Sequence, residues 1–205
     1  MTWALKARRY WVIIVVAIVA SVAGTTAGNV DLPIPFLSSL LGPSSMPAAV
    51  IPSLVLAVVA GAMIQSAELF WTATSVRNVV AHSMVSAVGI IAVVVFTSIL
   101  TGTFVHDYAS AWLLVRDVVG FLLFWSSARA LGARRLAGLV PVVYLLLASA
   151  FARNSVGEVR GWAWILERNL GNPWAIATLV LGGLLTVIYV LRQRPLLGRT
   201  TSARD

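Results

Sequence analysis

Long apolar runs follow one another along almost the whole chain, and short polar intervals rich in glycine, proline or charge separate them. Each run holds about 20 residues, the length of helix that crosses the hydrocarbon core of a bilayer. The six predicted membrane-spanning helices cover residues 11–28, 48–64, 79–100, 111–130, 136–152 and 174–191. Because no stretch remains for a folded soluble domain, we expect an all-α membrane protein with one transmembrane domain, residues 1–205.

The polar interval before the last run, residues 153–173, combines charged side chains with large apolar ones. If residues 161–170 are helical, Trp162 and Leu170 fall near one face of that helix. An amphipathic pattern of this kind is typical of a helix that lies on a membrane surface. The candidate site residues of this segment are Trp162, Trp164 and Glu167.

The first run carries small residues at every fourth position, Ala20, Gly24 and Gly28. Such a stripe lets another helix approach closely. That helix can belong to the same chain or to a second subunit, and both interpretations stay open. A basic start before an apolar run also fits a signal peptide; we interpret the run as the first span.

Composition supports membrane insertion, because 60% of the residues are hydrophobic and only 11% are charged, against about 25% in soluble domains. The net charge of +8 comes from arginines at the ends of apolar runs, which is a pattern of membrane topology rather than of nucleic-acid binding. The chain has no cysteine, which excludes disulfides, thiolate nucleophiles and cysteine-ligated metals.

The distribution of lysine and arginine predicts the orientation. One side receives eleven of the fifteen basic residues: Lys6, Arg8, Arg9, Arg77, Arg129, Arg134, Arg135, Arg192, Arg194, Arg199 and Arg204. The other side receives Arg153, Arg160 and Arg168, and Arg116 falls within a span. We therefore expect a multi-pass protein of the cell membrane with both termini in the cytoplasm and residues 153–173 outside.

Arg116 and Asp117 are ionisable residues inside the fourth predicted span. Such residues are expensive in hydrocarbon and are functional hypotheses for that reason. Helical side chains lean toward the N-terminus, so we expect Arg116 to reach the outer headgroups. Adjacent residues do not face each other on a helix, so each of the two is expected to need its own partner. A structural role and a role in a substrate path or proton relay both stay open.

Enzyme chemistry has little support in the sequence. His82 and His106 fall on opposite sides of the predicted membrane, and the chain holds no phosphate-binding loop and no HExxH pattern. We predict no catalytic residue, no bound metal and no cofactor.

The interval between the second and third spans carries Glu68, Phe70, Trp71 and Arg77, and it reads as an amphipathic cytoplasmic loop. With six spans, a basic N-terminal lead and an apolar outer hairpin before the last span, this arrangement resembles the permease subunits of ABC-2 type ABC transporters. The resemblance covers most of the chain and lies in the order of elements rather than in a residue motif.

The resemblance implies an exporter of a hydrophobic or amphipathic substrate, built from two permeases, identical or pseudo-symmetric, and separate ATP-binding subunits that hold ATP and magnesium. Glu68, Phe70, Trp71 and Arg77 would form the coupling loop. Arg129, Arg134 and Arg135 would form a second cytoplasmic contact, and residues 161–170 an outer hairpin helix. The chain departs from the family at its start, where the usual amphipathic helix would have to fit into residues 2–9.

Two other classes stay open. The size, the span count and the small-residue stripe also suit a substrate-binding subunit of an energy-coupling-factor vitamin importer, which would dock through its first helix. A membrane scaffold or immunity protein would instead use the tryptophan-rich outer segment to contact a partner or lipid.

Overall fold

The protein folds into a bundle of long helices, seen here in a computed structural model that describes residues 2–33, 45–73, 79–133, 136–153 and 158–193. The long helices are α1 (Thr2–Thr26), α3 (Val50–Ala73), α4 (Val79–Val105), α5 (Tyr108–Ala130), α6 (Leu139–Phe151) and α7 (Pro173–Gln193). A 3₁₀ helix, η1 (Gly161–Leu166), lies between α6 and α7, and the strands β1 (Asp31–Pro33) and β2 (Ser45–Pro47) lie between α1 and α3.

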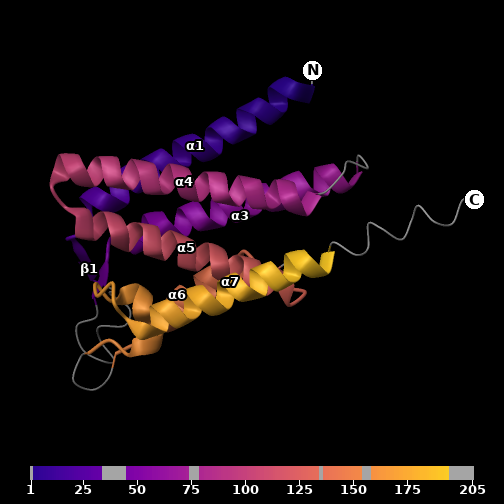
Figure 1. Ribbon diagram of the computed structural model, residues 1–205. Coiled ribbons are helices and arrows are strands. Elements are labelled where there is room, and N and C mark those ends of the chain that lie inside the picture. Colours follow the sequence, from indigo (N-terminus) through magenta and orange to yellow (C-terminus); the bar gives the residue numbers. More distant parts are fainter. Residues whose placement is uncertain (1, 34–44, 74–78, 134–135, 154–157, 194–205) are drawn as a thin grey trace, which may run out of the picture.

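Successive long helices run in opposite directions along the bundle (Figure 1). At one end, which we call the hairpin end, β1 and β2 pair antiparallel, with Asp31 opposite Pro47. The start of α1 and the end of α7 both lie at the opposite end, which we call the termini end (Figure 1). The β1–β2 pair was not predicted from the sequence, because two three-residue strands leave no periodic pattern.

Helix α5 is the centre of the bundle, because it contacts each of the other five long helices. Its Leu114, Val118 and Phe121 are fully buried. A Cβ atom at Gly24 of α1 would meet the side chain of Leu114, and one at Gly28 would meet Ser110. The predicted small-residue stripe therefore packs within the same chain, against α5.

Each predicted span coincides with a helix, but several helices extend beyond the expected limits. Helix α4 continues to Val105, so the turn to α5 consists of His106 and Asp107 alone. Helix α3 continues to Ala73, so the first part of the interval expected to form an amphipathic loop, residues 65–73, is the end of this helix. Residues 65–73 contain neither glycine nor proline, and nothing in this stretch interrupts the helix.

Two helical segments within the described residues, Ser86–Val105 and Tyr108–Ala130, are long and apolar enough to cross a membrane. The remaining apolar segments are shorter: Trp11–Thr26, Val50–Ser66, Leu139–Phe151 and Pro173–Ile188. The sequence-based prediction of six helices is thus matched by six long helices, two of which meet the length and composition of a span.

Candidate functional site

Arg116 and Asp117 form a buried ion pair on the central helix α5. The Arg116 Nε atom donates to Asp117 Oδ1 at 3.0 Å, and the Arg116 Nη2 atom lies 2.9 Å from the same oxygen. Arg116 exposes 8% of its surface and Asp117 2%. The expectation that these neighbours need separate partners is wrong, because the long arginine side chain turns back to the carboxylate beside it.

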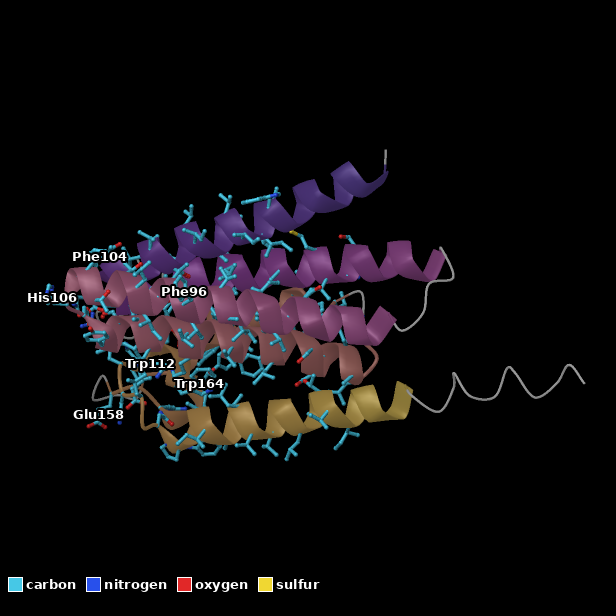
Figure 2. All side chains as sticks on the ribbon, turned by 45° about the horizontal axis from the view of Figure 1, so that its top comes forward. Phe96, Phe104, His106, Trp112, Glu158 and Trp164 are labelled. Atoms are coloured by element: carbon cyan, nitrogen blue, oxygen red, sulfur yellow. The ribbon has the colours of Figure 1, made fainter. Side chains whose placement is uncertain are left out.

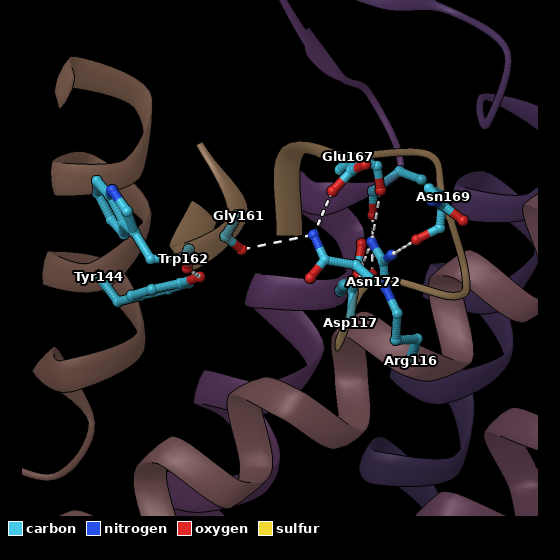
Figure 3. Close-up of polar contacts among 10 residues, drawn as sticks. Arg116, Asp117, Tyr144, Gly161, Trp162, Glu167, Asn169 and Asn172 are labelled. Atoms are coloured by element: carbon cyan, nitrogen blue, oxygen red, sulfur yellow. Dashed lines mark hydrogen bonds and ion pairs between the residues drawn. The ribbon is translucent and has the colours of Figure 1, made fainter. Parts of the chain in front are cut away.

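Arg116 also binds the connecting segment, as we call residues 158–172 between α6 and α7. Its Nη1 atom donates to the carbonyl of Asn169 at 3.0 Å, and Nη2 donates to the carbonyl of Glu167 at 2.9 Å (Figure 3). Glu167 has extended backbone angles after the end of η1, so its carbonyl has left the helical hydrogen-bond pattern. Arg116 therefore satisfies protein carbonyls, and the expectation that it reaches lipid headgroups is wrong.

The indole of Trp164 lies beneath this network. The guanidinium carbon of Arg116 is 5.2 Å from the centre of the Trp164 ring, a distance at which a cation is attracted to an aromatic face. The same ring occupies the space beside Gly120, where a Cβ atom would collide with it. Trp164 is 1% exposed, so η1 inserts one of its two tryptophans into the bundle.

The predicted surface helix over residues 161–170 is wrong. Only Gly161–Leu166 is helical, with 3₁₀ geometry and a break at Ala163, and residues 167–172 follow without a helix. Four consecutive residues, Ala163 to Leu166, are buried, whereas a surface helix would bury one face only. The glycine, asparagine and proline at residues 169, 171, 172 and 173 favour an end to the helix here.

Trp162 is held at the other end of η1 by a tyrosine of α6. The Tyr144 hydroxyl donates to the Trp162 carbonyl at 2.8 Å (Figure 3). The Tyr144 ring also lies 4.5 Å from the ring of Phe124, centre to centre, and Phe124 stacks on Trp164 at 6.4 Å. These contacts attach the connecting segment to α6 as well as to α5.

Asn172 is the last residue of the connecting segment, and it was not among the site residues predicted from the sequence. Its Nδ2 atom donates to Glu167 Oε2 and to the Gly161 carbonyl, and its Oδ1 atom accepts from the Trp174 backbone N–H at 2.8 Å. The last contact caps the start of α7. The signal was present, since asparagine followed by proline is a common beginning of a helix.

Two arginines, one in the connecting segment and one at the end of α6, bind the β hairpin. Arg168 pairs with Asp31 at 2.9 Å, and Arg153, at the end of α6, donates to the Ser45 carbonyl at 2.7 Å. Glu167, the neighbour of Arg168 in sequence, accepts a hydrogen bond from Asn172 instead.

Of the predicted cytoplasmic contacts, those within the described residues lie at the termini end. Glu68, Phe70 and Trp71 belong to the last turns of α3, of which the backbone is described, and Arg77 lies outside the described residues. Arg134 and Arg135 also lie outside them. Arg129 is buried, and its guanidinium carbon lies 4.7 Å from the centre of the Trp125 ring.

Around Arg116, the guanidinium, the Asp117 carboxylate and the carbonyls of Glu167 and Asn169 all take part in hydrogen bonds. These bonds fasten the connecting segment to α5. Among the described residues, no three His, Asp or Glu side chains gather closely enough to hold a metal ion. No family model, curated protein or solved structure matches the chain. The resemblance to ABC-2 permeases thus rests on the order of its elements alone.

Proposed function

We propose that the chain is an integral membrane protein whose six long helices all span the bilayer. The described apolar segments contain three charged residues, Arg116, Asp117 and Arg129, and all three are buried. The surface between the two ends of the bundle is therefore uncharged, and it carries large apolar side chains such as Phe96 and Leu181. An apolar surface of this extent in water would promote aggregation, whereas lipid tails accept it without cost.

The positive-inside rule orients this bundle. Four of the eleven basic residues assigned to the cytoplasmic side, Lys6, Arg8, Arg9 and Arg192, belong to the start of α1 and the end of α7, at the termini end. Arg153 and Arg168 contact the β hairpin at the other end. In our proposal the termini end faces the cytoplasm and the hairpin end faces outward.

We further propose that the protein is the permease subunit of an ATP-driven ABC transporter that exports a hydrophobic or amphipathic substrate. One observation carries this proposal: the connecting segment before the last helix folds back into the bundle, with Trp164 and Ile165 buried beside α5. A segment that enters the outer half of the bundle before the last span is the feature that the resemblance implies.

The packing of α5 bears on the route of the substrate. Leu114, Val118 and Phe121 fill the centre of the described bundle, so a path would run between two copies of the chain rather than through one. The small-residue stripe of α1 is already covered by α5, which disfavours the vitamin-importer alternative, since docking through that stripe would require it to be free.

The coupling surface is the end of α3, where Glu68, Phe70 and Trp71 extend the helix at the termini end. Copurification of an ATPase subunit with the full chain is the first test. Glu68→Ala should then leave the ATPase bound while uncoupling ATP hydrolysis from transport. Glu158→Ala is the matched control, because it removes the same charge at the hairpin end and should transport normally.

Normal transport by Glu68→Ala with the ATPase bound would contradict the coupling role. Native mass spectrometry separates the alternatives. A tightly bound small solute on a monomer without ATPase would favour the vitamin-importer subunit, and the absence of both would favour a scaffold or immunity protein.

A further inference from the structure

The surface of the bundle changes in character along the helix axis near the hairpin end. Figure 2 shows His106 at the tip, Phe104, Glu158 and Trp112 slightly further in, and Phe96 deeper. The exposed ion pair of Arg168 with Asp31 joins two segments of the same end. Charged groups and a layer of aromatic side chains therefore lie near the hairpin end, and the exposed surface of the described apolar segments beyond them is uncharged.

The aromatic layer is made of side chains on four different helices. Its members are Phe104 at the end of α4, Tyr108 and Trp112 at the start of α5, Phe151 at the end of α6 and Trp174 at the start of α7. Each of them exposes about half of its surface or more. Tyr108 and Trp112 are four residues apart and so lie on one face of α5. The polar atom of a tyrosine or tryptophan favours water while its ring favours lipid, which is why both concentrate at membrane interfaces.

Below this layer the exposed residues of α7 are apolar: Ile176, Val180, Leu181, Leu184, Leu185, Val187 and Ile188. The next basic residue, Arg192, follows Trp174 by eighteen residues, or about 27 Å along a helix. That length agrees with a hydrocarbon core of about 30 Å. Trp174 and Arg192 thus mark the two boundaries on one helix.

We infer that Phe104, Tyr108, Trp112, Phe151 and Trp174 form an aromatic rim at the boundary between the outer headgroups and the acyl chains, with the lipid bilayer as its partner. The inference rests on the membrane embedding proposed above and is independent of the ATPase. The rim also gives the depth of the Arg116 site in the membrane. Along α5, Arg116 lies four residues, about 6 Å, below Trp112, and Gly120 lies eight residues, about 12 Å, below it. Trp164, which packs on Gly120, therefore reaches hydrocarbon depth.

The absence of cysteine allows a direct test with the full chain in phosphatidylcholine vesicles. Single substitutions Ile176→Cys, Val180→Cys and Leu184→Cys lie on exposed positions of α7 and can carry a nitroxide label. The ratio of oxygen to nickel-chelate accessibility gives the depth of each label. We expect depth to increase by about 6 Å at each step, with Leu184 near the middle of the bilayer.

Fluorescence provides a second measurement on the rim itself. Lipids brominated near the headgroup should quench Trp112 and Trp174 more strongly than lipids brominated near the chain end. Trp112→Phe and Trp174→Phe should each remove part of the shallow quenching. Trp164→Phe is the control and should leave it unchanged, because Trp164 is buried in the protein.

The outcomes are distinguishable. Water accessibility at all three α7 positions would overturn the rim together with the membrane embedding on which the proposed function depends. A depth gradient without shallow quenching of Trp112 and Trp174 would overturn the rim alone. A gradient with shallow quenching would support the rim, whether or not an ATPase binds the chain.

Discussion

The Arg116 Nε atom donates to the carboxylate of Asp117 at 3.0 Å, although the two residues are adjacent on α5. The remaining nitrogens of the guanidinium bind the carbonyls of Glu167 and Asn169. The positive charge is thus neutralised by the residue beside it, and its other hydrogen bonds fasten a segment some fifty residues later in the chain. A buried charge pair of this kind is costly to disrupt on one side only.

Replacing Arg116 alone should be strongly destabilising. Arg116→Leu leaves the Asp117 carboxylate buried without its cation, and we expect the free energy of unfolding to fall by about 3–5 kcal/mol. The double variant Arg116→Leu/Asp117→Leu removes both charges and should lose less than the two single variants together. Unfolding in detergent micelles, followed by circular dichroism, measures all four proteins.

The double-mutant cycle provides the control. A coupling energy of about 0.5–3 kcal/mol is expected for residues in direct contact. If the two single losses simply add up in the double variant, Arg116 and Asp117 do not interact as described.

Gly120 should tolerate no side chain. A Cβ atom there would collide with the Trp164 ring, and the strain of overpacking, about 1–3 kcal/mol, should exceed the helix-propensity gain of alanine over glycine, about 1 kcal/mol. We therefore expect Gly120→Ala to lower the melting temperature in detergent. Trp164→Phe, which shortens the ring, should restore part of the loss in the Gly120→Ala background.

Gly183 of α7 is the matched control, because a Cβ atom there meets nothing within 4 Å. Gly183→Ala should be neutral or stabilising through helix propensity alone. Equal effects at Gly120 and Gly183 would mean that Trp164 does not pack against α5.

The long helices could be predicted from the sequence because each is an apolar run of sufficient length. The contacts of the site could not. Whether Arg116 turns toward Asp117 or toward solvent depends on carbonyls at Glu167 and Asn169, and no local pattern connects these positions. The same holds for η1. The sequence of Gly161–Leu166 is compatible with an amphipathic helix and with a 3₁₀ helix, and the packing of Trp164 beside Gly120, which is distant in sequence, favours the second.

Asp107 should make stability depend on pH. Its carboxylate accepts from the Ser110 hydroxyl at 2.6 Å, the Ser110 backbone N–H at 3.0 Å and the Asn29 amide at 2.6 Å. The Ser110 hydroxyl above all lowers the pKa of Asp107 below its ordinary value of 3.8. A carboxyl with a lower pKa in the folded state stabilises the protein above the unfolded pKa, and this contribution is lost as the pH falls through the folded pKa.

Asp107→Asn keeps an oxygen that can cap α5 but carries no charge. The melting temperature of the unmodified protein should therefore exceed that of Asp107→Asn at pH 7, and the difference should shrink as the pH falls below about 4. Because other carboxylates titrate in the same range, the difference between the two proteins is the quantity to measure. A difference that is constant from pH 7 to pH 3 would contradict the prediction.

Asn172 joins two roles that substitution can separate. Asn172→Ala removes the cap on the Trp174 N–H, which costs about 1 kcal/mol, and also the donors to Glu167 and Gly161. Asn172→Asp keeps the cap and places a negative charge at the start of α7, which favours the helix. It also sets a second carboxylate beside that of Glu167, and the repulsion should make this variant less stable than the unmodified protein at pH 7.

The two variants should respond differently to acid. Protonation relieves the repulsion between neighbouring carboxylates, so one of the pair titrates with a raised pKa in the folded state, and its contribution to stability grows as the pH falls. Relative to the unmodified protein, Asn172→Asp should regain melting temperature between pH 7 and pH 4, whereas Asn172→Ala should not. If Asn172→Asp is as stable as the unmodified protein at pH 7, the residue acts only as a helix cap, and its bond to Glu167 does not hold the connecting segment.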